Sequence, residues 1–344
     1  MKNILYIVGV LLLIASCSMA ETVPSVKEDN VGQLTVNITL SEATKASVMD
    51  SENVMHDLQV FVFGQSDGKL YFHREYHLGV ESCTLRNSIT VKPGMYSVWV
   101  VANYPLITDV KTLSELKKKG VLLKHNTSSS FVMRGYDNNV NVTTEGGEAN
   151  IEMERLVSRI FVRNITNNCS ESIGELGVRA VFLANVVGNQ NLAGTASPMN
   201  MYWYNKCGCV GGFEGREIDG TTYMPDVPDM TWRTINKTIQ CGQTEYIGAR
   251  VYGFQNTETT TSEEFPFTPR MSRLCFILVQ KDPLTSELVE HHVYLDLSHL
   301  MLTNTTYSFD LVVDGNIGLK DVAITVTANL VSGYDTVEGG SFDI

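Results

Sequence analysis

The chain has 344 residues, of which 43% are hydrophobic and 19% are charged, so it is long enough for about two globular domains. Its 38 acidic and 26 basic residues give a formal net charge of −12. This balance argues against nucleic acids and anionic membrane surfaces as partners, because both bind clustered Lys and Arg.

The first residues predict an export signal. Lys2 precedes an apolar run over residues 4–14, which is too short to cross a membrane. The ending Leu13-Ile14-Ala15-Ser16-Cys17 fits a bacterial lipobox, in which the cysteine becomes the acylated first residue of the mature chain. We therefore expect residues 1–16 to be a lipoprotein signal peptide and Cys17 to carry the lipid anchor. The alternative is cleavage after Ala20, which would discard Cys17.

Short runs of alternating apolar and polar residues follow along the chain. Turn signals such as Ser66-Asp67-Gly68-Lys69 and Lys92-Pro93-Gly94 separate them. This pattern predicts a mainly all-β fold of two antiparallel β-sandwich domains with a few short helices. The clearest runs are residues 34–41, 58–63, 95–101, 159–162, 274–279, 292–297, 307–313 and 322–330.

The clearest predicted helix spans residues 108–122. Val110, Leu113 and Leu116 fall on one face of it, Thr108 or Asp109 can cap its start, and a glycine can end it at position 120.

We place a domain boundary near position 154. Residues 149–153 have the pattern of a closing strand and residues 156–162 that of an opening strand, which predicts domains at 46–154 and 155–344. The stretch 189–236 is rich in Gly, Pro, Tyr and Trp and is expected to form elaborated loops.

The sequence contains no recognisable catalytic motif, so we expect neither an enzyme nor a cofactor. His291, His292, Asp296 and His299 lack the spacing of a zinc site, and Cys207-Gly208-Cys209 has no second close pair, so no metal is expected. Export would permit disulfides among the six later cysteines, but their pairing does not follow from sequence. These cysteines are Cys83, Cys169, Cys207, Cys209, Cys241 and Cys275.

Several stretches, taken together and in order, resemble the fimbrillin family, the type V pilins of Bacteroidia. They are Thr44-Lys45-Ala46, Glu52-Asn53, residues 58–63, residues 94–103 (GMYSVWVVAN), residues 131–135 (FVMRG), residues 154–159 (ERLVSR) and residues 304–307 (NTTY). One departure is the stretch 251–256 (VYGFQN), where such proteins often carry an aromatic residue followed by Glu-Asn.

The resemblance implies transthyretin-like sandwiches and a maturation pathway. Such pilins are exported as lipoproteins and cut by a trypsin-like protease behind their first strand. A C-terminal strand of another subunit then fills the vacated groove. Here the implied propeptide is 17–45 with cleavage between Lys45 and Ala46, although the family's usual residue at this point is arginine. The implied removable strand buries Leu34, Val36, Ile38 and Leu40, and the implied donor strand presents Val322, Ile324, Val326, Ala328 and Leu330.

The function implied is a structural subunit of a surface fimbrium used in adhesion. Its partners would be copies of itself, other fimbrial subunits, the outer membrane before maturation, and a host-surface protein or glycan. The alternatives are an anchor or tip subunit, or a glycan-binding lipoprotein with Tyr202, Trp203, Tyr204 and Trp232 as an aromatic platform. The two matching terminal strands can also be ordinary members of their own domains.

Overall fold

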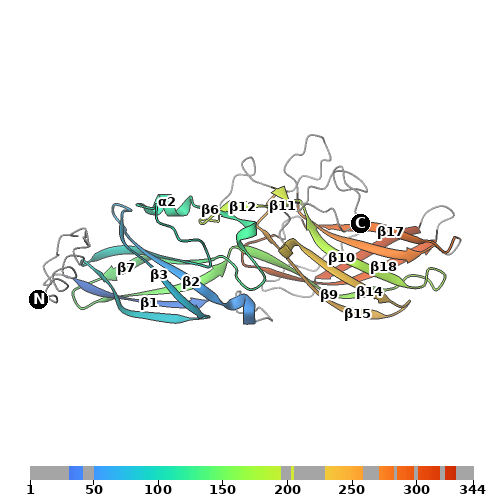
Figure 1. The fold of residues 1–344 in the computed structure, drawn as a ribbon, viewed down its shortest axis with the longest axis horizontal. Helices are drawn as coiled ribbons and strands as arrows, with labels where there is room; N and C mark the ends of the chain where they lie inside the picture. Colours follow the sequence, from blue (N-terminus) through green and yellow to red (C-terminus); the bar gives the residue numbers. More distant parts are fainter. Residues whose placement is uncertain are drawn as a thin grey trace, which may run out of the picture.

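The computed structural model describes residues 31–41, 50–194, 203–204, 229–258, 271–282, 285–297, 301–317 and 322–330. Nearly all of its regular structure is β-strand, which confirms the expected fold class. Figure 1 shows two layered units lying end to end along an elongated molecule. We call residues 32–155 the first half and residues 157–330 the second half. No helix in these described ranges is long and apolar enough to span a membrane.

The first half is one seven-stranded sheet, in the order β3-β2-β5-β7-β8-β1-β4, that bends into two layers. β7 pairs with β8 at only two positions, Met133–Arg155 and Arg134–Glu154, so β3-β2-β5-β7 can separate from β8-β1-β4 and enclose a core. The elements are β1 (Gly32–Leu40), η2 (Asp50–Asn53), β2 (Met55–Gly64), β3 (Leu70–Val80), β4 (Cys83–Val91), β5 (Gly94–Ala102), α2 (Leu113–Lys117), β6 (Gly120–Leu122), η3 (Leu123–His125), β7 (Met133–Val142) and β8 (Gly147–Arg155).

The second half packs the sheet β15-β9-β18-β19 against the sheet β14-β10-β16-β17. Its elements are β9 (Val157–Asn167), β10 (Leu176–Ala184), β11 (Val186–Val187), β12 (Asn189–Asn191), β13 (Trp203–Tyr204), η5 (Asp229–Thr231), β14 (Trp232–Ile239), β15 (Thr244–Phe254), β16 (Arg273–Lys281), β17 (Leu288–Asp296), β18 (Thr306–Ile317) and β19 (Val322–Leu330).

Most strand pairs are antiparallel, as the sequence pattern predicted, but each half contains one parallel pair. β1 runs parallel to β8 and antiparallel to β4. β9 likewise runs parallel to β18 and antiparallel to β15. In each half the opening strand therefore lies beside a strand from the end of that half. Long connections allow this parallel pairing, and an apolar alternation does not distinguish it from antiparallel pairing.

The predicted helix at 108–122 is wrong in its extent, because α2 covers only Leu113–Lys117. Thr112 caps it in a capping box with Glu115, and the expected caps at Thr108 and Asp109 are not used. Before α2 the backbone bonds to the start of β3, since Leu70 N donates to Lys111 O at 2.8 Å. After α2 the chain forms β6, which pairs with β12 of the second half. Tertiary pairing has replaced helix on both sides.

Residues 103–125 cover the outer face of β2. The side-chain amide of Gln59 donates to Tyr104 O at 2.9 Å and accepts from Ile107 N at 2.8 Å. Phe61 and Phe63 share that strand face and are fully buried. β2 is therefore buried on both faces, which explains why its sequence LQVFVF is nearly continuous in apolar residues.

Gly32 gives a test of how tightly the start of β1 is held. A Cβ at this position would lie 2.0 Å from the backbone oxygen of Thr143, whereas one at Gly120 would meet no atom within 4 Å. We expect Gly32→Ala to destabilise the protein by about 1–3 kcal/mol, because the backbone must shift. Gly120→Ala should stay within about 0.5 kcal/mol of the unsubstituted protein. Equal midpoints of the two variants in urea unfolding would contradict this.

Candidate functional site

The first strand of the chain is enclosed on both edges. β1 pairs with β8 from Leu34–Gly147 to Leu40–Met153 and with β4 from Gly32–Val91 to Ile38–Cys83. Leu34, Val36, Ile38 and Leu40 are at most 3% exposed. On the opposite face the Asn37 amide donates to Asn150 Oδ1 at 2.9 Å. Without β1, two strand edges and an apolar slot would open to solvent.

The end of β1 reaches the second half. Ser41 N donates to Met153 O at 3.0 Å, and the side-chain amide of Asn304 donates to Ser41 Oγ at 2.9 Å. The predicted cleavage site, Lys45 and Ala46, lies outside the described residues, as does the predicted lipidation site Cys17. The described chain continues from Asp50, the first residue of η2.

The last described strand, β19, lies at the edge of its sheet. It pairs with β18 alone, in unbroken antiparallel register from Ile317–Val322 to Phe309–Leu330. The predicted donor residues Val322, Ile324, Val326, Ala328 and Leu330 occupy alternate positions of this ladder. Their partners Leu311, Val313 and Phe309 in β18 are at most 1% exposed. β1 and β19 each have nine residues. They differ in that β1 lies between two strands, whereas β19 lies at the edge of its sheet.

A buried carboxylate joins the two halves. Glu52, in η2, is 2% exposed and forms an ion pair with Arg159 of β9, with 3.0 Å between Arg159 Nη1 and Glu52 Oε2. Tyr252 of β15 donates its hydroxyl to Glu52 Oε1 at 2.7 Å. Burial, and next the Glu52 charge, raises the pKa of Tyr252. The phenol therefore stays a neutral donor at physiological pH.

Arg155 completes this junction from the other side. Its guanidinium donates to Glu52 O at 3.1 Å and to Asn53 Oδ1 at 2.6 Å, and lies over the Phe131 ring at 5.6 Å. Burial lowers the pKa of Arg155 to about 10, so the side chain remains charged at neutral pH. Two cations thus meet Glu52, one at its carboxylate and one at its backbone.

Two asparagines tie loops to this junction. Asn103, at φ 55°, accepts from His56 N and donates to Val54 O and Phe131 O, each within 2.9 Å. Asn304, at φ 56°, accepts from Arg155 N at 3.2 Å. Left-handed backbone of this kind is tolerated by Asn better than by most residues. We call Glu52, Asn53, Asn103, Phe131, Arg155, Arg159, Tyr252 and Asn304 the junction cluster.

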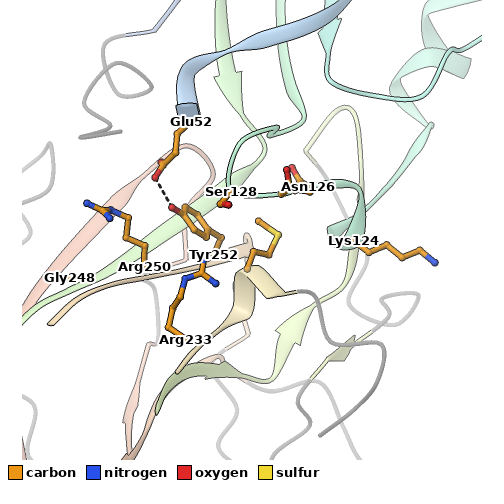
Figure 2. Close-up of a pocket in the computed structure, with 10 residues that line it drawn as sticks. Glu52, Lys124, Asn126, Ser128, Arg233, Gly248, Arg250 and Tyr252 are labelled. Atoms are coloured by element: carbon orange, nitrogen blue, oxygen red, sulfur yellow. Dashed lines mark hydrogen bonds between the residues drawn. The ribbon is translucent and has the colours of Figure 1, made fainter. Parts of the chain in front are cut away.

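A cavity of about 530 Å³ opens beside the junction cluster (Figure 2). Figure 2 shows Glu52 bonded to Tyr252 at its wall, with Ser128 and Arg233 contributed by opposite halves. The Glu52 carboxylate forms the ion pair with Arg159. The Arg250 guanidinium lies 4.7 Å from the centre of the Phe161 ring. Of the groups that line the cavity, Glu52 and Tyr252 are thus engaged in the contact between the two halves, and Arg250 packs within the second half.

Of the residues considered for a metal site, the structure describes His291, His292 and Asp296. His292 Nε2 lies 2.8 Å from Glu290 Oε1, and burial lowers the pKa of the neighbouring His291. His299 lies outside the described residues, as do Cys207 and Cys209. Within the described ranges there is no group of three or more His, Cys, Asp or Glu side chains that could hold a metal ion.

The aromatic platform considered for glycan binding is only partly described. The Trp232 ring stacks on Phe182 with 4.4 Å between centroids, and its Nε1 donates to Thr234 Oγ1. Tyr202 lies outside the described residues, and for Trp203 and Tyr204 only the backbone, as β13, is described. Trp232 thus contacts its own sheet.

Several solved bacterial protein structures share this fold. A candidate cell adhesion protein from Parabacteroides distasonis aligns with a TM-score of 0.60 at 14% identity, over 89% of this chain and 98% of that one. A candidate cell adhesion protein from Bacteroides eggerthii aligns at 0.57 and 13%, over 88% and 96%. A fimbrilin from Porphyromonas gingivalis aligns at 0.55 and 12%, over 87% and 97%. No family model and no curated protein sequence matches the chain.

These likenesses establish the fold, and they agree with the fold implied by the fimbrillin resemblance. The structure also shows where residues that carry this resemblance meet. Glu52-Asn53, Asn103, Phe131, Arg155, Arg159 and Asn304 belong to separate stretches that carried it, and all of them lie in the junction cluster. Sequence reasoning did not bring them together. A partial signal is Arg155 and Arg159, which lie among apolar residues in ERLVSRIFV, where a buried charge needs a partner, whereas Glu52 lies in the polar stretch DSEN and gives no such signal.

The Glu52–Arg159 pair is testable by removing one charge. We expect Glu52→Gln to destabilise the protein by about 3–5 kcal/mol, because it leaves Arg159 charged and buried without its counter-ion. Asp109→Asn is the matched control, since it breaks the exposed Lys119–Asp109 pair at 2.6 Å and should barely move the unfolding midpoint. The proposed role of Glu52 fails if both variants unfold at the same denaturant concentration.

Proposed function

We propose that the protein is a structural subunit of a cell-surface fimbrium, built from two β-sandwich domains that divide near residue 154. Subunits join when a protease removes β1 and the C-terminal strand of another copy takes its place. The observation that carries this proposal is β1 itself: the first strand of the fold, enclosed between β8 and β4, with four side chains buried.

The energetics of the slot favour refilling. Burying Leu34, Val36, Ile38 and Leu40 is worth roughly 6–12 kcal/mol, at about 1.5–3 kcal/mol for each side chain. An empty slot would also leave ladder groups of β8 and β4 without partners, and such edges are templates for an added strand. Loss of β1 therefore creates a strong and specific acceptor.

β19 has the properties needed in a donor. Its nine residues equal β1 in length, and its sequence VAITVTANL repeats the period-two alternation of LTVNITL. Its single partner strand means that leaving its own sheet breaks one ladder, whereas seating in the slot forms two. The exchange therefore gains a second ladder of backbone hydrogen bonds.

The two sites lie in different halves of an elongated molecule, which makes the contact head-to-tail (Figure 1). A contact between unlike surfaces that does not close into a ring propagates as a filament. The complete register of β19 favours a stalk subunit that both accepts and donates. An anchor would keep β1, and a tip would have no strand to donate.

Export and maturation complete the proposal. Cys17 would hold the precursor in the outer membrane by its lipid, and cleavage after Lys45 would free the chain together with β1. The filament would then act in adhesion to a host-surface protein or glycan. The protein is proposed to act by assembly and binding, without catalysis.

Cleavage can be tested on protein sheared from the cell surface. We expect its N-terminal residue to be Ala46 and Lys45→Ala to block both cleavage and assembly, because a trypsin-like protease needs the basic side chain. Lys27→Ala is the control, since Lys27 precedes β1 and cleavage there would not release it. N-terminal sequencing and intact mass report the result. Fibres of normal length from Lys45→Ala would contradict the cleavage step.

The donor strand can be tested by its period of two. Val326→Asp should abolish the denaturant-resistant ladder of polymers, because it places a charge at a position bound for the apolar slot. Thr327→Asp, one position along, should leave the ladder intact. Val326→Asp protein retains its own slot, so it should still accept a wild-type strand and shorten mixed fibres. If the two variants polymerise equally well, β19 is not the donor.

A further inference from the structure

Two cysteines of the second half, Cys169 and Cys241, lie in neighbouring loops. Cys169 follows the end of β9, and Cys241 lies in the turn between β14 and β15. The described cysteines are all reduced in the structure. Cys83 belongs to β4 of the first half, and Cys275 lies in β16, packed with Ala180 and Phe182. Among the described cysteines, Cys169 and Cys241 are therefore the two that lie close to each other.

The backbone holds both cysteines in place. Asn167 N donates to Gln243 O at 2.9 Å, and Gly242 N donates to Asn167 O at 2.7 Å. The Asn167 side-chain amide donates to Gly174 O and Ile239 O, each at 2.9 Å. The two segments are thus fastened together on either side of the thiols, and no backbone rearrangement is needed to bring them close.

The sulfur positions favour a bond. Cys241 Sγ lies 2.8 Å from the carbonyl oxygen of Cys169, which places it within about 5 Å of Cys169 Cα by standard backbone dimensions. A disulfide joins residues whose Cα atoms lie about 4.4–6.8 Å apart, so it needs neighbouring backbones, and the bonds of Asn167 to Gly242 and Gln243 make these two segments neighbours. Cys169 Sγ now points inward, where it accepts from Gln280 Nε2 at 3.2 Å. Rotation about its Cα–Cβ bond is the main movement required.

We propose that Cys169 and Cys241 form a disulfide in the mature protein. The oxidant is a disulfide of an exported thiol oxidoreductase, or a small-molecule disulfide. Cys241, the more exposed thiol, attacks it as the thiolate, forms a mixed disulfide and releases one thiol. Cys169 then attacks Cys241 Sγ and releases the second thiol. The two cysteines lose two protons and two electrons, and the oxidant's disulfide gains both.

The cross-link would fasten the strand that β19 pairs with. Asn168 N donates to Val313 O at 2.9 Å, and Cys169 Sγ contacts the same oxygen at 3.6 Å. Both contacts are made to β18. The disulfide would therefore link the β14–β15 turn covalently to the segment whose backbone bonds to β18 through Asn168, independently of whether β19 remains in its sheet.

Peptide mapping tests the bond on the full exported chain, trapped with an alkylating reagent before digestion. Trypsin releases the two cysteines in separate peptides, residues 164–179 and 238–250, each with a single cysteine. We expect these peptides as one linked species that reduction separates. Recovery of both peptides alkylated and unlinked, or linked to other cysteines, would overturn the proposal. Purified reduced protein treated with oxidised glutathione should give the same linked species.

Thermal unfolding gives a second readout. The disulfide would close a loop of 72 residues, so a reductant should lower the melting temperature by roughly 10 °C. Cys241→Ser should melt at the lower temperature with or without reductant. Cys83→Ser is the control and should keep the reductant-sensitive shift of the unsubstituted protein. An equal response of the Cys241→Ser variant to reductant would refute the bond.

Discussion

The ion pair between Glu52 and Arg159 is the contact on which the arrangement of the two halves depends. A carboxylate that is 2% exposed is stable only with its charge compensated, and here the compensation comes from the other half of the chain. Such a pair adds little net stability, but it tolerates few alternative geometries. The loops that carry Asn103, Phe131 and Asn304 close around it, so the cluster defines one orientation and places the end of β1 beside the second half.

β1 and β19 are similar in sequence and opposite in their surroundings. β1 has two strand neighbours and a buried face, while β19 has one strand neighbour at the margin of a sheet. Moving a strand with one neighbour into a position with two would add one ladder of backbone hydrogen bonds. The fold therefore carries both a position that requires a strand and a strand in a less favourable position, which is the basis of the proposed assembly.

How much of the structure the sequence predicts depends on how far apart in the chain the interacting residues lie. The alternation of Leu34, Val36, Ile38 and Leu40 depends only on local period and correctly predicts a strand with one buried face. The helix predicted at 108–122 is too long because Lys111 and Gly120 bond to distant strands, which no local pattern records. The parallel pairing of β1 with β8, and the meeting of Glu52 with Arg159 and Tyr252, are long-range choices of the same kind. The resemblance marked Glu52 and Arg159 without revealing that they touch.

The pairing of β6 with β12 has a mechanical consequence. In the view of Figure 1 this pair of strands lies along the upper side of the molecule, while η2 lies along the lower side, so the halves are fastened at two separated places. A molecule whose halves are joined at two separated places resists bending between them. A pulling force along the molecule would act on both contacts at once. If one contact broke, the other would carry the whole force. Stiffness would then be a property of the single subunit.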